Sequence, residues 1–339
     1  MTAEAIVAAP RRSRGPWAMA LRRLSRDKAA MAALLLFVAI VAVSLLAPAY
    51  AAYSHTDPFR STLDAVIEID GRQIPVMEQS TEGLGLGYTP IGPTWVLGKY
   101  FLGADNQGRD VMARLLYGGR NSLLIAGAAT FLTLTIGTAV GLIAGYFGGF
   151  TDTVLSRILD VLWAFPVYLL AISLSIVLIA HGLDLGVITI ESGSLWLPIF
   201  IIGVVYIPYV ARPVRGQVLS LKHSEFVLAA IGLGVPGHRI LLRDILPNVS
   251  TTLIVFMPLM LALNMLTESA LSFLSIGVQP PDASWGTIIQ DGQGLLYTRP
   301  TVAMAGGFAI VLAVLALNVL GDGLRDALDP RSKIRIGRG

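Results

Sequence analysis

Cysteine is absent from this 339-residue sequence. Its absence excludes disulfide bonds, thiolate metal sites and cysteine nucleophiles. Charged residues are scarce, at 14% of the chain, whereas soluble domains carry about 25%. Hydrophobic residues make up 54%, and the formal net charge is only +3. This shortage of charge is too large for a soluble core to explain, so we expect a protein that crosses a membrane several times.

Motifs for catalysis and for nucleotide binding are also missing. The chain has no G-x-x-x-x-G-K-[ST] phosphate loop, no G-x-S-x-G elbow and no H-E-x-x-H pair. Its four histidines offer no metal-ligand spacing, and no basic–aromatic pattern suggests nucleic acid. Asp105, Asn106 and Asp110 are spaced somewhat like calcium ligands, but the twelfth position is Leu116 instead of Glu. We therefore expect no catalytic residue, no metal and no cofactor in this chain.

Six apolar runs are long enough to be membrane spans. They are Ala29–Ala49, Ser122–Phe147, Val161–Ala180, Leu195–Val210, Val249–Gly277 and Val302–Leu320. A span needs about 20 apolar residues, which predicts an all-α polytopic membrane protein with six transmembrane helices. The alternative for the first run is a secretory signal, because Ala49-Tyr50-Ala51 resembles a cleavage site. Its length exceeds a signal core of about 7–15 residues, which favours an uncleaved anchor.

The distribution of Lys and Arg predicts how the chain is oriented. These residues gather on the termini and on the loops that six spans place on the same side, so the positive-inside rule puts both termini in the cytoplasm. The expected parts are a basic cytoplasmic N-terminus (1–28), a first transmembrane helix (29–49), an outer segment (50–120), a five-helix core (121–322) containing a cytoplasmic loop (214–248), and a cytoplasmic C-terminus (323–339). Within the outer segment, Asp70-Gly71 between two short apolar runs predicts a β-hairpin.

The cytoplasmic stretch Lys222–Pro247 contains a short predicted helix. Ser224 is placed to cap it, and Glu225 in its first turn suits the helix dipole. Its apolar face is formed by Phe226, Ala229, Ala230 and Leu233. The residues that stop it are Gly232, Gly234, Pro236 and Gly237. A second helical run is expected to end at Pro247. An amphipathic helix offered between two spans indicates that something docks there.

Polar residues inside the fifth run form a stripe. Asn264, Glu268 and Ser272 are spaced i, i+4, i+8 and share one helix face. An intramembrane carboxylate is costly and normally faces the bundle interior or water. Glu268 is therefore either a pathway or gating residue, or an interhelical hydrogen-bond pin, and the second interpretation is favoured.

A glycine stripe marks the second run. Gly137, Gly141 and Gly145 form GxxxGxxxG, a spacing that lets helix backbones approach closely. We expect helix packing there.

Four blocks of sequence resemble the C-type permease subunits of peptide ABC importers, the DppC/OppC family, which includes nickel and glutathione permeases. The blocks are LGADNQGRDVMARLLYGGRNSL (Leu102–Leu123), GYFGGFTDTVLSRILDVLWAFP (Gly145–Pro166), VRGQVLSLKHSEFVLAAIGLGVPGHRILLRDILPN (Val214–Asn248), and ESALSFLSIGVQPPDASWG (Glu268–Gly286) together with NVLGDGLRDALDPR (Asn318–Arg331). The resemblance implies a type I ABC importer permease fold in a bacterial inner membrane.

The resemblance further implies that Lys222–Pro247 is the loop that couples such permeases to their ATPases, with the pattern EAA...G.........I.LP. The positions that fit are Ala229, Ala230, Gly234, Leu246 and Pro247. Leu228 stands where the pattern has Glu, and Asp244 where it has Ile. Polar contacts of the family's Glu therefore do not carry over to this chain.

The expected function follows from the resemblance and from the missing phosphate loop. The chain would be one half of a heterodimeric pathway for di- or oligopeptides, without catalysis of its own. The implied partners are a second, B-type permease subunit, two ABC ATPase subunits that bind ATP and Mg, an extracytoplasmic substrate-binding protein, a peptide and the lipid bilayer. The main alternative is a secondary transporter driven by an ion gradient through Glu268. A membrane-embedded enzyme is a third, weaker alternative.

Overall fold

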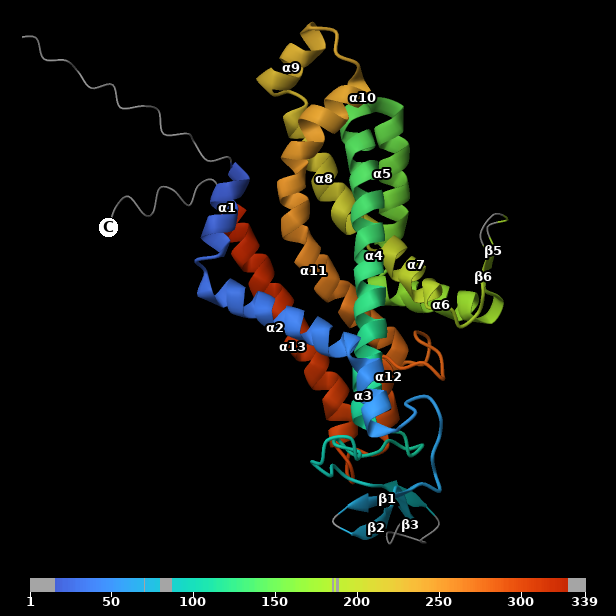
Figure 1. The fold of residues 1–339 in the computed structure, drawn as a ribbon. Helices are drawn as coiled ribbons and strands as arrows, with labels where there is room; N and C mark the ends of the chain where they lie inside the picture. The colour runs from blue at the N-terminus through green and yellow to red at the C-terminus, as the bar shows by residue number, and fades with distance from the viewer. Residues whose placement is uncertain (1–15, 70, 80–86, 185, 187–188, 329–339) are drawn as a thin grey trace, which may run out of the picture.

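The computed structural model describes residues 16–69, 71–79, 87–184, 186 and 189–328. It is an elongated helical bundle with a small β-rich segment at one end and a helical loop at the other (Figure 1). The helices are α1 (Pro16–Leu24), α2 (Lys28–Leu45), α3 (Ala47–Ser54), α4 (Val111–Phe147), α5 (Gly149–Ala164), α6 (Val167–His181), α7 (Trp196–Val205), α8 (Ile207–Leu221), α9 (Glu225–Gly232), α10 (Gly237–Ile240), the π-helical turn η1 (Leu241–Ile245), α11 (Leu246–Phe273), α12 (Trp285–Gln293) and α13 (Thr301–Leu328). The strands are β1 (Val66–Ile69), β2 (Arg72–Pro75), β3 (Met77–Gln79), β4 (Tyr88–Pro90), β5 (Leu183–Asp184) and β6 (Thr189–Ile190).

Five helical segments of the described chain are long and apolar enough to cross a bilayer: α2, α4, α7–α8, α10–η1–α11 and α13. A sixth candidate is the pair α5–α6, which is bent by 89°. The single helix expected over Val161–Ala180 is therefore wrong. Pro166 disfavours helical geometry in the residue before it, and Phe165 is extended, with φ −95° and ψ 139°. The multi-span, mostly helical fold class is confirmed.

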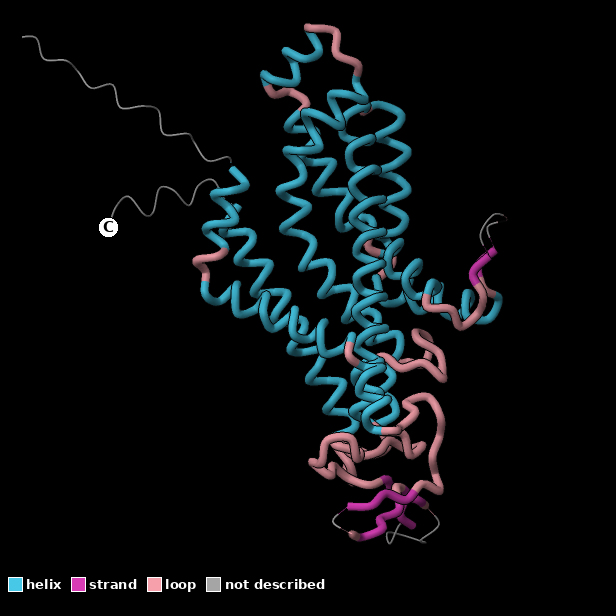
Figure 2. Tube along the Cα trace, in the orientation of Figure 1, coloured by secondary structure: helices cyan, strands magenta, loops and turns pink. Residues whose placement is uncertain are grey.

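The longest helix, α4, runs along most of the bundle and packs against α8 (Figures 1 and 2). The glycine stripe lies at this contact. A Cβ at Gly141 would lie 2.7 Å from the carbonyl oxygen of Ala211, and one at Gly145 would lie 2.7 Å from Cβ of Val218. A Cβ at Gly137 would lie 2.8 Å from Cβ of Val210. Only glycine permits this approach of the two backbones.

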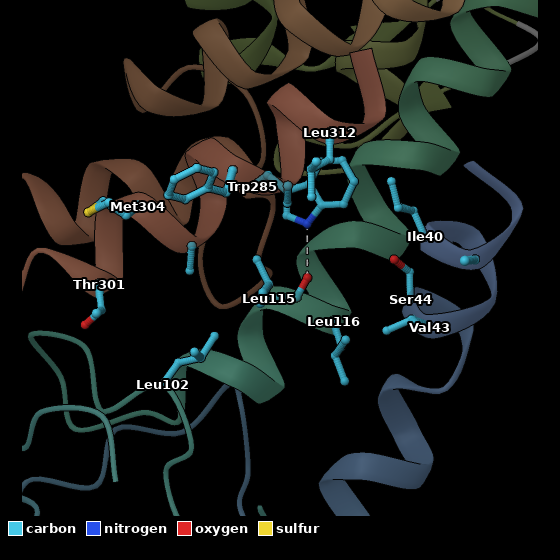
Figure 3. A pocket seen from close by; sticks show the side chains of 14 residues that line it. Ile40, Val43, Ser44, Leu102, Leu115, Leu116, Trp285, Thr301, Met304 and Leu312 are labelled. Carbon is cyan, nitrogen blue, oxygen red and sulfur yellow. Dashed lines mark hydrogen bonds between the residues drawn. The ribbon is translucent and has the colours of Figure 1, made fainter. Parts of the chain in front are cut away.

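The first span, α2, packs along α13. Asp27 caps it by accepting hydrogen bonds from the backbone amides of Ala29 and Ala30, at 2.9 and 3.1 Å. Between α2, α4, α12 and α13 lies an apolar pocket of about 480 Å³ (Figure 3). The indole nitrogen of Trp285 donates to the carbonyl of Leu115 at its wall, at 3.1 Å. None of the residues that line it is charged, so this pocket offers nothing to hold a charged solute.

The outer segment contains two short antiparallel pairs, β1–β2 and β3–β4. Ile69 pairs with Arg72, and Gly71 has φ +75°, so the predicted hairpin is present. Its Asp70 lies outside the described residues, as do 1–15 of the basic N-terminus and 329–339 of the C-terminus. The segment has a small core of its own, formed by Val76, Met77, Tyr100 and Ala104.

Candidate functional site

The helix α9 lies at the end of the bundle opposite the β-strands (Figure 1). Ser224 occupies its N-cap position with extended backbone, but its side chain does not cap the helix. Instead its hydroxyl donates to the carbonyl of Leu221, at 2.5 Å. Ser224 thus closes the preceding turn, and the predicted side-chain cap is wrong.

The faces of α9 differ sharply in exposure. Val227 is fully buried in a core that also contains Val218, Ile240 and Ile245. The exposed apolar side chains, called the α9 apolar face below, are Phe226, Leu228, Ile231 and Leu233. Leu233 reaches 83% exposure. Of the face expected from the sequence, Phe226, Ala229 and Leu233 are exposed, whereas Ala230 packs partly against the same core as Val227.

The helix α9 ends at the glycines that were predicted to stop it. The helix stops at Gly232, and Gly234 has φ +74°, a conformation that suits glycine. The amide of Val235 donates back to the carbonyl of Ala230 at 3.1 Å, which satisfies a carbonyl at the helix end. Glu225 is exposed in the first turn.

Pro247 does not end the second helical run as expected. The run continues from α10 through η1 into α11, where Leu246 and Pro247 are the first residues. Proline in a helix clashes with the carbonyl four residues earlier and removes a hydrogen bond. The π-helical turn at Leu241–Ile245, just before Pro247, widens the backbone there, and Asn248 Nδ2 donates to the carbonyl of Asp244 at 2.6 Å. Leu246 is half-buried and Pro247 exposed.

Glu268 is fully buried in the middle of the bundle and receives three hydroxyl groups. Ser122 Oγ donates to its Oε2 at 2.8 Å, Ser272 Oγ to its Oε1 at 2.7 Å and Ser269 Oγ to its Oε2 at 3.3 Å. Ser122 in turn accepts from the amide of Trp285, at 3.1 Å. One carboxyl group thereby ties α11 to α4 and to the start of α12.

Asn264 makes a second tie between the same two helices. Its Nδ2 donates to Thr130 Oγ1 at 2.9 Å, and Thr130 donates to the carbonyl of Ala126 at 2.7 Å. The polar stripe Asn264, Glu268 and Ser272 is therefore wholly buried. Asn264 and Glu268 bond to α4, whereas Ser272 donates to Glu268 and accepts from the amide of Val278. This geometry is that of an interhelical pin.

The sequence reasoning missed a buried cluster of charges at the outer end. Arg109 Nε lies 2.7 Å from Asp105 Oδ2, and Arg114 Nε lies 3.3 Å from the same oxygen. Both arginines also reach Asp291 Oδ2, each at 2.9 Å. Arg114 donates in addition to the carbonyl of Pro58, at 3.0 Å. The cluster joins the outer segment to α4 and α12.

Part of this cluster lies in the segment GADNQGRD, which contains Asp105 and Arg109. The segment belongs to the first block that resembles the permease family, and its spacing does not complete a calcium loop. Asp105 Oδ1 accepts from the backbone amides of Gln107 and Arg109, at 2.9 and 3.0 Å. Its carboxylate therefore shapes the loop and neutralises arginine. Asp291, far along the chain, could not have been paired with these arginines by local pattern.

Residues 137–334 match the model of the binding-protein-dependent transport system inner membrane component, and residues 15–65 match the N-terminal TM domain of oligopeptide transport permease C. The chain belongs to the binding-protein-dependent permease family. It is a C-type permease component of an ABC importer, related to the OppC and DppC permeases.

Curated relatives cover most of this permease. It is 36% identical over 94% of its length, and 90% of the relative, to an oligopeptide transport system permease protein OppC of Haemophilus influenzae. It is 32% identical, over 94% of its length and 91% of the relative, to a dipeptide transport system permease protein DppC of Alkalihalophilus pseudofirmus. A glutathione transport system permease protein GsiD of Pectobacterium atrosepticum is 38% identical over 69% of this chain and 73% of that one.

A solved structure supports the fold of the permease. An inward-facing MetNI methionine ABC transporter matches with a TM-score of 0.51 and 19% identity, over 64% of this chain and 97% of the other. At that identity the likeness shows the fold alone, which is the type I importer permease fold expected from the sequence.

Proposed function

We propose that this permease forms half of a heterodimeric pathway in an ATP-driven importer, and that the α9 apolar face docks on an ATPase subunit. The observation that carries the proposal is the exposure of four large apolar side chains on α9, while Val227 anchors the helix to its own bundle. A solvated surface helix normally turns its apolar residues inward. An exposed apolar patch on a short helix is typical of a protein interface.

The direction of transport and the cargo are part of the same proposal. The α9 end and both termini lie in the cytoplasm, and the β-rich segment meets a substrate-binding protein outside. ATP and Mg act on the two partner ATPases, whose closure moves α9 and rocks the spans. Di- or oligopeptides are the proposed cargo, because relatives at 32–36% identity carry oligopeptide and dipeptide names. A ligand screen of the cognate binding protein tests the cargo directly.

The coupling role is tested on the complete transporter with Leu233→Glu. Leu233 is the most exposed member of the α9 apolar face, so the added charge leaves the core intact while opposing burial in a partner groove. Ala230→Glu is a less clean variant, because Ala230 packs partly against the core. The matched control is His223→Glu, which adds the same charge at an exposed position just before α9.

We expect Leu233→Glu to lower both peptide uptake and binding-protein-stimulated ATP hydrolysis at least tenfold, because a buried unpaired charge costs several kcal/mol. His223→Glu should retain both activities within about twofold, since it leaves the apolar contact in place. Unchanged uptake and hydrolysis in Leu233→Glu would show that α9 does not couple the subunits.

A further inference from the structure

A charged pair, Asp160 on α5 and Arg212 on α8, lies at the surface of the chain, where contact with lipid chains would be unfavourable for charged groups. Arg212 Nη2 donates to Asp160 Oδ1 at 2.7 Å, and the two side chains remain 38% and 50% exposed. Arg212 is part of the apolar span formed by α7 and α8, Trp196–Leu221. Ionisable side chains within spans almost always face the bundle interior or a water-filled cavity. Since this pair is open at the surface of the chain, the surface around it borders water.

The exposed sides of α5 support the same placement. One side is polar and contains Thr153, Arg157 and Asp160, at spacings of four and three residues that place them on one face. The other side is apolar, with the exposed residues Phe150, Val154, Ile158 and Val161. A helix with one apolar and one polar exposed side can meet lipid or protein on the first and water on the second. Arg212 lies on the polar side, through its bond to Asp160.

Aromatic rings hold Arg212 in a fixed direction. Its guanidinium carbon lies 4.6 Å from the ring centroid of Trp163, and that ring lies 4.5 Å from the ring of Tyr209. Among the described residues, Asp160 is the one hydrogen-bond acceptor of Arg212. A guanidinium has five N–H donors in a planar fork that suits a carboxylate. The arginine is therefore positioned with donors to spare.

A second charged pair joins the same two helices and has a different geometry. Arg215 donates from Nε and Nη2 to both oxygens of Asp152, at 2.5 and 2.6 Å. Asp152 also accepts from Ser156 Oγ, at 3.1 Å. Its side chain is 18% exposed and that of Arg215 is 32% exposed. This pair is a bidentate tie between the helices. The pair Arg212–Asp160 is joined by one bond and is open, and the other oxygen of Asp160 has, within the described chain, only a longer ion pair, 3.7 Å, with the exposed Arg157.

We propose that Arg212 and Asp160 form a binding site for the two charged ends of a zwitterionic peptide in transit. The peptide carboxylate binds the free edge of the Arg212 guanidinium, and the peptide ammonium binds the exposed carboxylate of Asp160. No covalent bond is made or broken: the ion pair of Arg212 with Asp160 stays in place, and two ion pairs with the peptide are added to it. The inference rests on the proposed transport of peptides and adds a site that distinguishes free from blocked termini.

The test uses the complete transporter in liposomes, with the binding protein saturated by tetraalanine, by its C-terminal amide or by its N-acetyl derivative. Dialanine and its two blocked forms are measured in the same way and are the decisive set, because the charged ends of a dipeptide are close enough to reach two side chains that are in contact. Uptake is expressed per loaded binding protein, so that selection by that protein does not enter. We expect the wild type to carry the free peptide at least about tenfold faster than either blocked form, the size of one charge-assisted hydrogen bond. In Arg212→Gln, the C-terminal amide should be taken up as fast as the free peptide. In Asp160→Asn, the N-acetyl form should be taken up as fast as the free peptide.

Two further variants separate binding from structure. Arg212→Lys keeps the charge and should retain the preference for a free carboxylate with a raised KM. Asp152→Asn breaks the neighbouring tie and should leave the preference for free termini unchanged. Wild-type discrimination in Arg212→Gln and Asp160→Asn would overturn the inference while leaving peptide transport standing. A wild-type complex that carries no peptide at all would overturn both.

Discussion

The two ends of the bundle present opposite chemistry. At the outer end, Arg109, Arg114 and Asp105 are almost completely buried and satisfy one another with Asp291. At the other end, α9 leaves large apolar side chains open. The buried charges of the outer end are thus satisfied within the chain itself, whereas the α9 end leaves an apolar face open, which we propose that another protein covers.

If α9 docks as proposed, this difference predicts that the α9 end moves more easily relative to a partner than the outer end does. A buried ion cluster is costly to open, because removing one partner leaves a charge unpaired in a poorly solvated place. Covering or uncovering the exposed α9 apolar face, in contrast, breaks no contact within this chain. Between the two ends, α4 and α11 are joined by Glu268 and Asn264, so the proposed movement of α9 would be passed to a pair of helices that are tied together.

The largest effect is expected at the outer cluster. Asp291→Asn keeps the size of the side chain but leaves Arg109 and Arg114 with one carboxylate fewer, which should cost about 3–5 kcal/mol. Asp64→Asn is the matched control, since Asp64 is exposed in the same segment and should change stability by less than about 0.5 kcal/mol. Denaturant unfolding in detergent measures both. Equal stability of the two variants would show that the cluster does not hold the outer end.

A pH effect is expected close to the same cluster. Burial raises the pKa of Asp110 from 3.8 to about 6, although the amides of Met112 and Ala113 and the hydroxyl of Thr56 favour its charged form. Between pH 4 and 6 the folded state therefore binds more protons than the unfolded state, and stability falls as pH rises. The loss of stability levels off above about pH 7, where Asp110 is ionised in both states.

Asp110→Asn isolates this effect, because Asn caps a helix about as well as Asp. The difference in free energy of unfolding between wild type and Asp110→Asn should shift against the wild type by about 2 kcal/mol from pH 4 to pH 6.5. Unfolding curves at several pH values give that difference. A constant difference over the whole range would mean that Asp110 titrates normally.

Local patterns in the sequence predicted the features that are set within a single helix. The glycines at Gly137, Gly141 and Gly145 and the stripe at Glu268 follow from helical spacing, and the apolar runs follow from length. The pairing of Arg109 with Asp291, 182 residues away, depends on tertiary structure and has no local signal. The kink at Pro166 does have a local signal, since proline restricts the backbone of the residue before it. The apolar run alone, read as one span, does not include this signal.

The faces of α9 show a related limit. Periodicity put Phe226 and Ala230 on one apolar face, yet the bundle itself takes Val227 and part of Ala230. A helix that is apolar on most sides carries no sequence signal for which side its own chain covers. The π-helical turn before Pro247 was missed because a proline in a helical pattern normally marks an end.

A smaller effect is expected at Glu268, in the middle of the bundle. Ser122 and Ser272 donate to different oxygens of Glu268, so Glu268→Gln keeps an acceptor for one of them and turns an NH2 group toward the other. The substitution should cost about 1–3 kcal/mol, with peptide uptake kept within a few fold. Ser122→Ala removes one of the same bonds from α4 and should have a similar cost. If Glu268→Gln folds as well as the wild type but uptake loses its dependence on an ion gradient, Glu268 is a transport residue and the pin interpretation fails.

The smallest effect on the isolated subunit is expected at the α9 apolar face, and it sharpens the contrast between the ends. Val227→Ala opens a cavity in the core and should cost about 2 kcal/mol. Leu233→Ala removes more apolar surface, yet it should change the stability of the isolated subunit by no more than about 0.5 kcal/mol, because Leu233 is exposed there. In the assembled transporter the same substitution removes buried surface and should weaken retention of the ATPase on affinity purification. A cost of 2 kcal/mol for Leu233→Ala in the subunit alone would mean that α9 packs on its own chain, and the α9 end would then be as complete as the outer one.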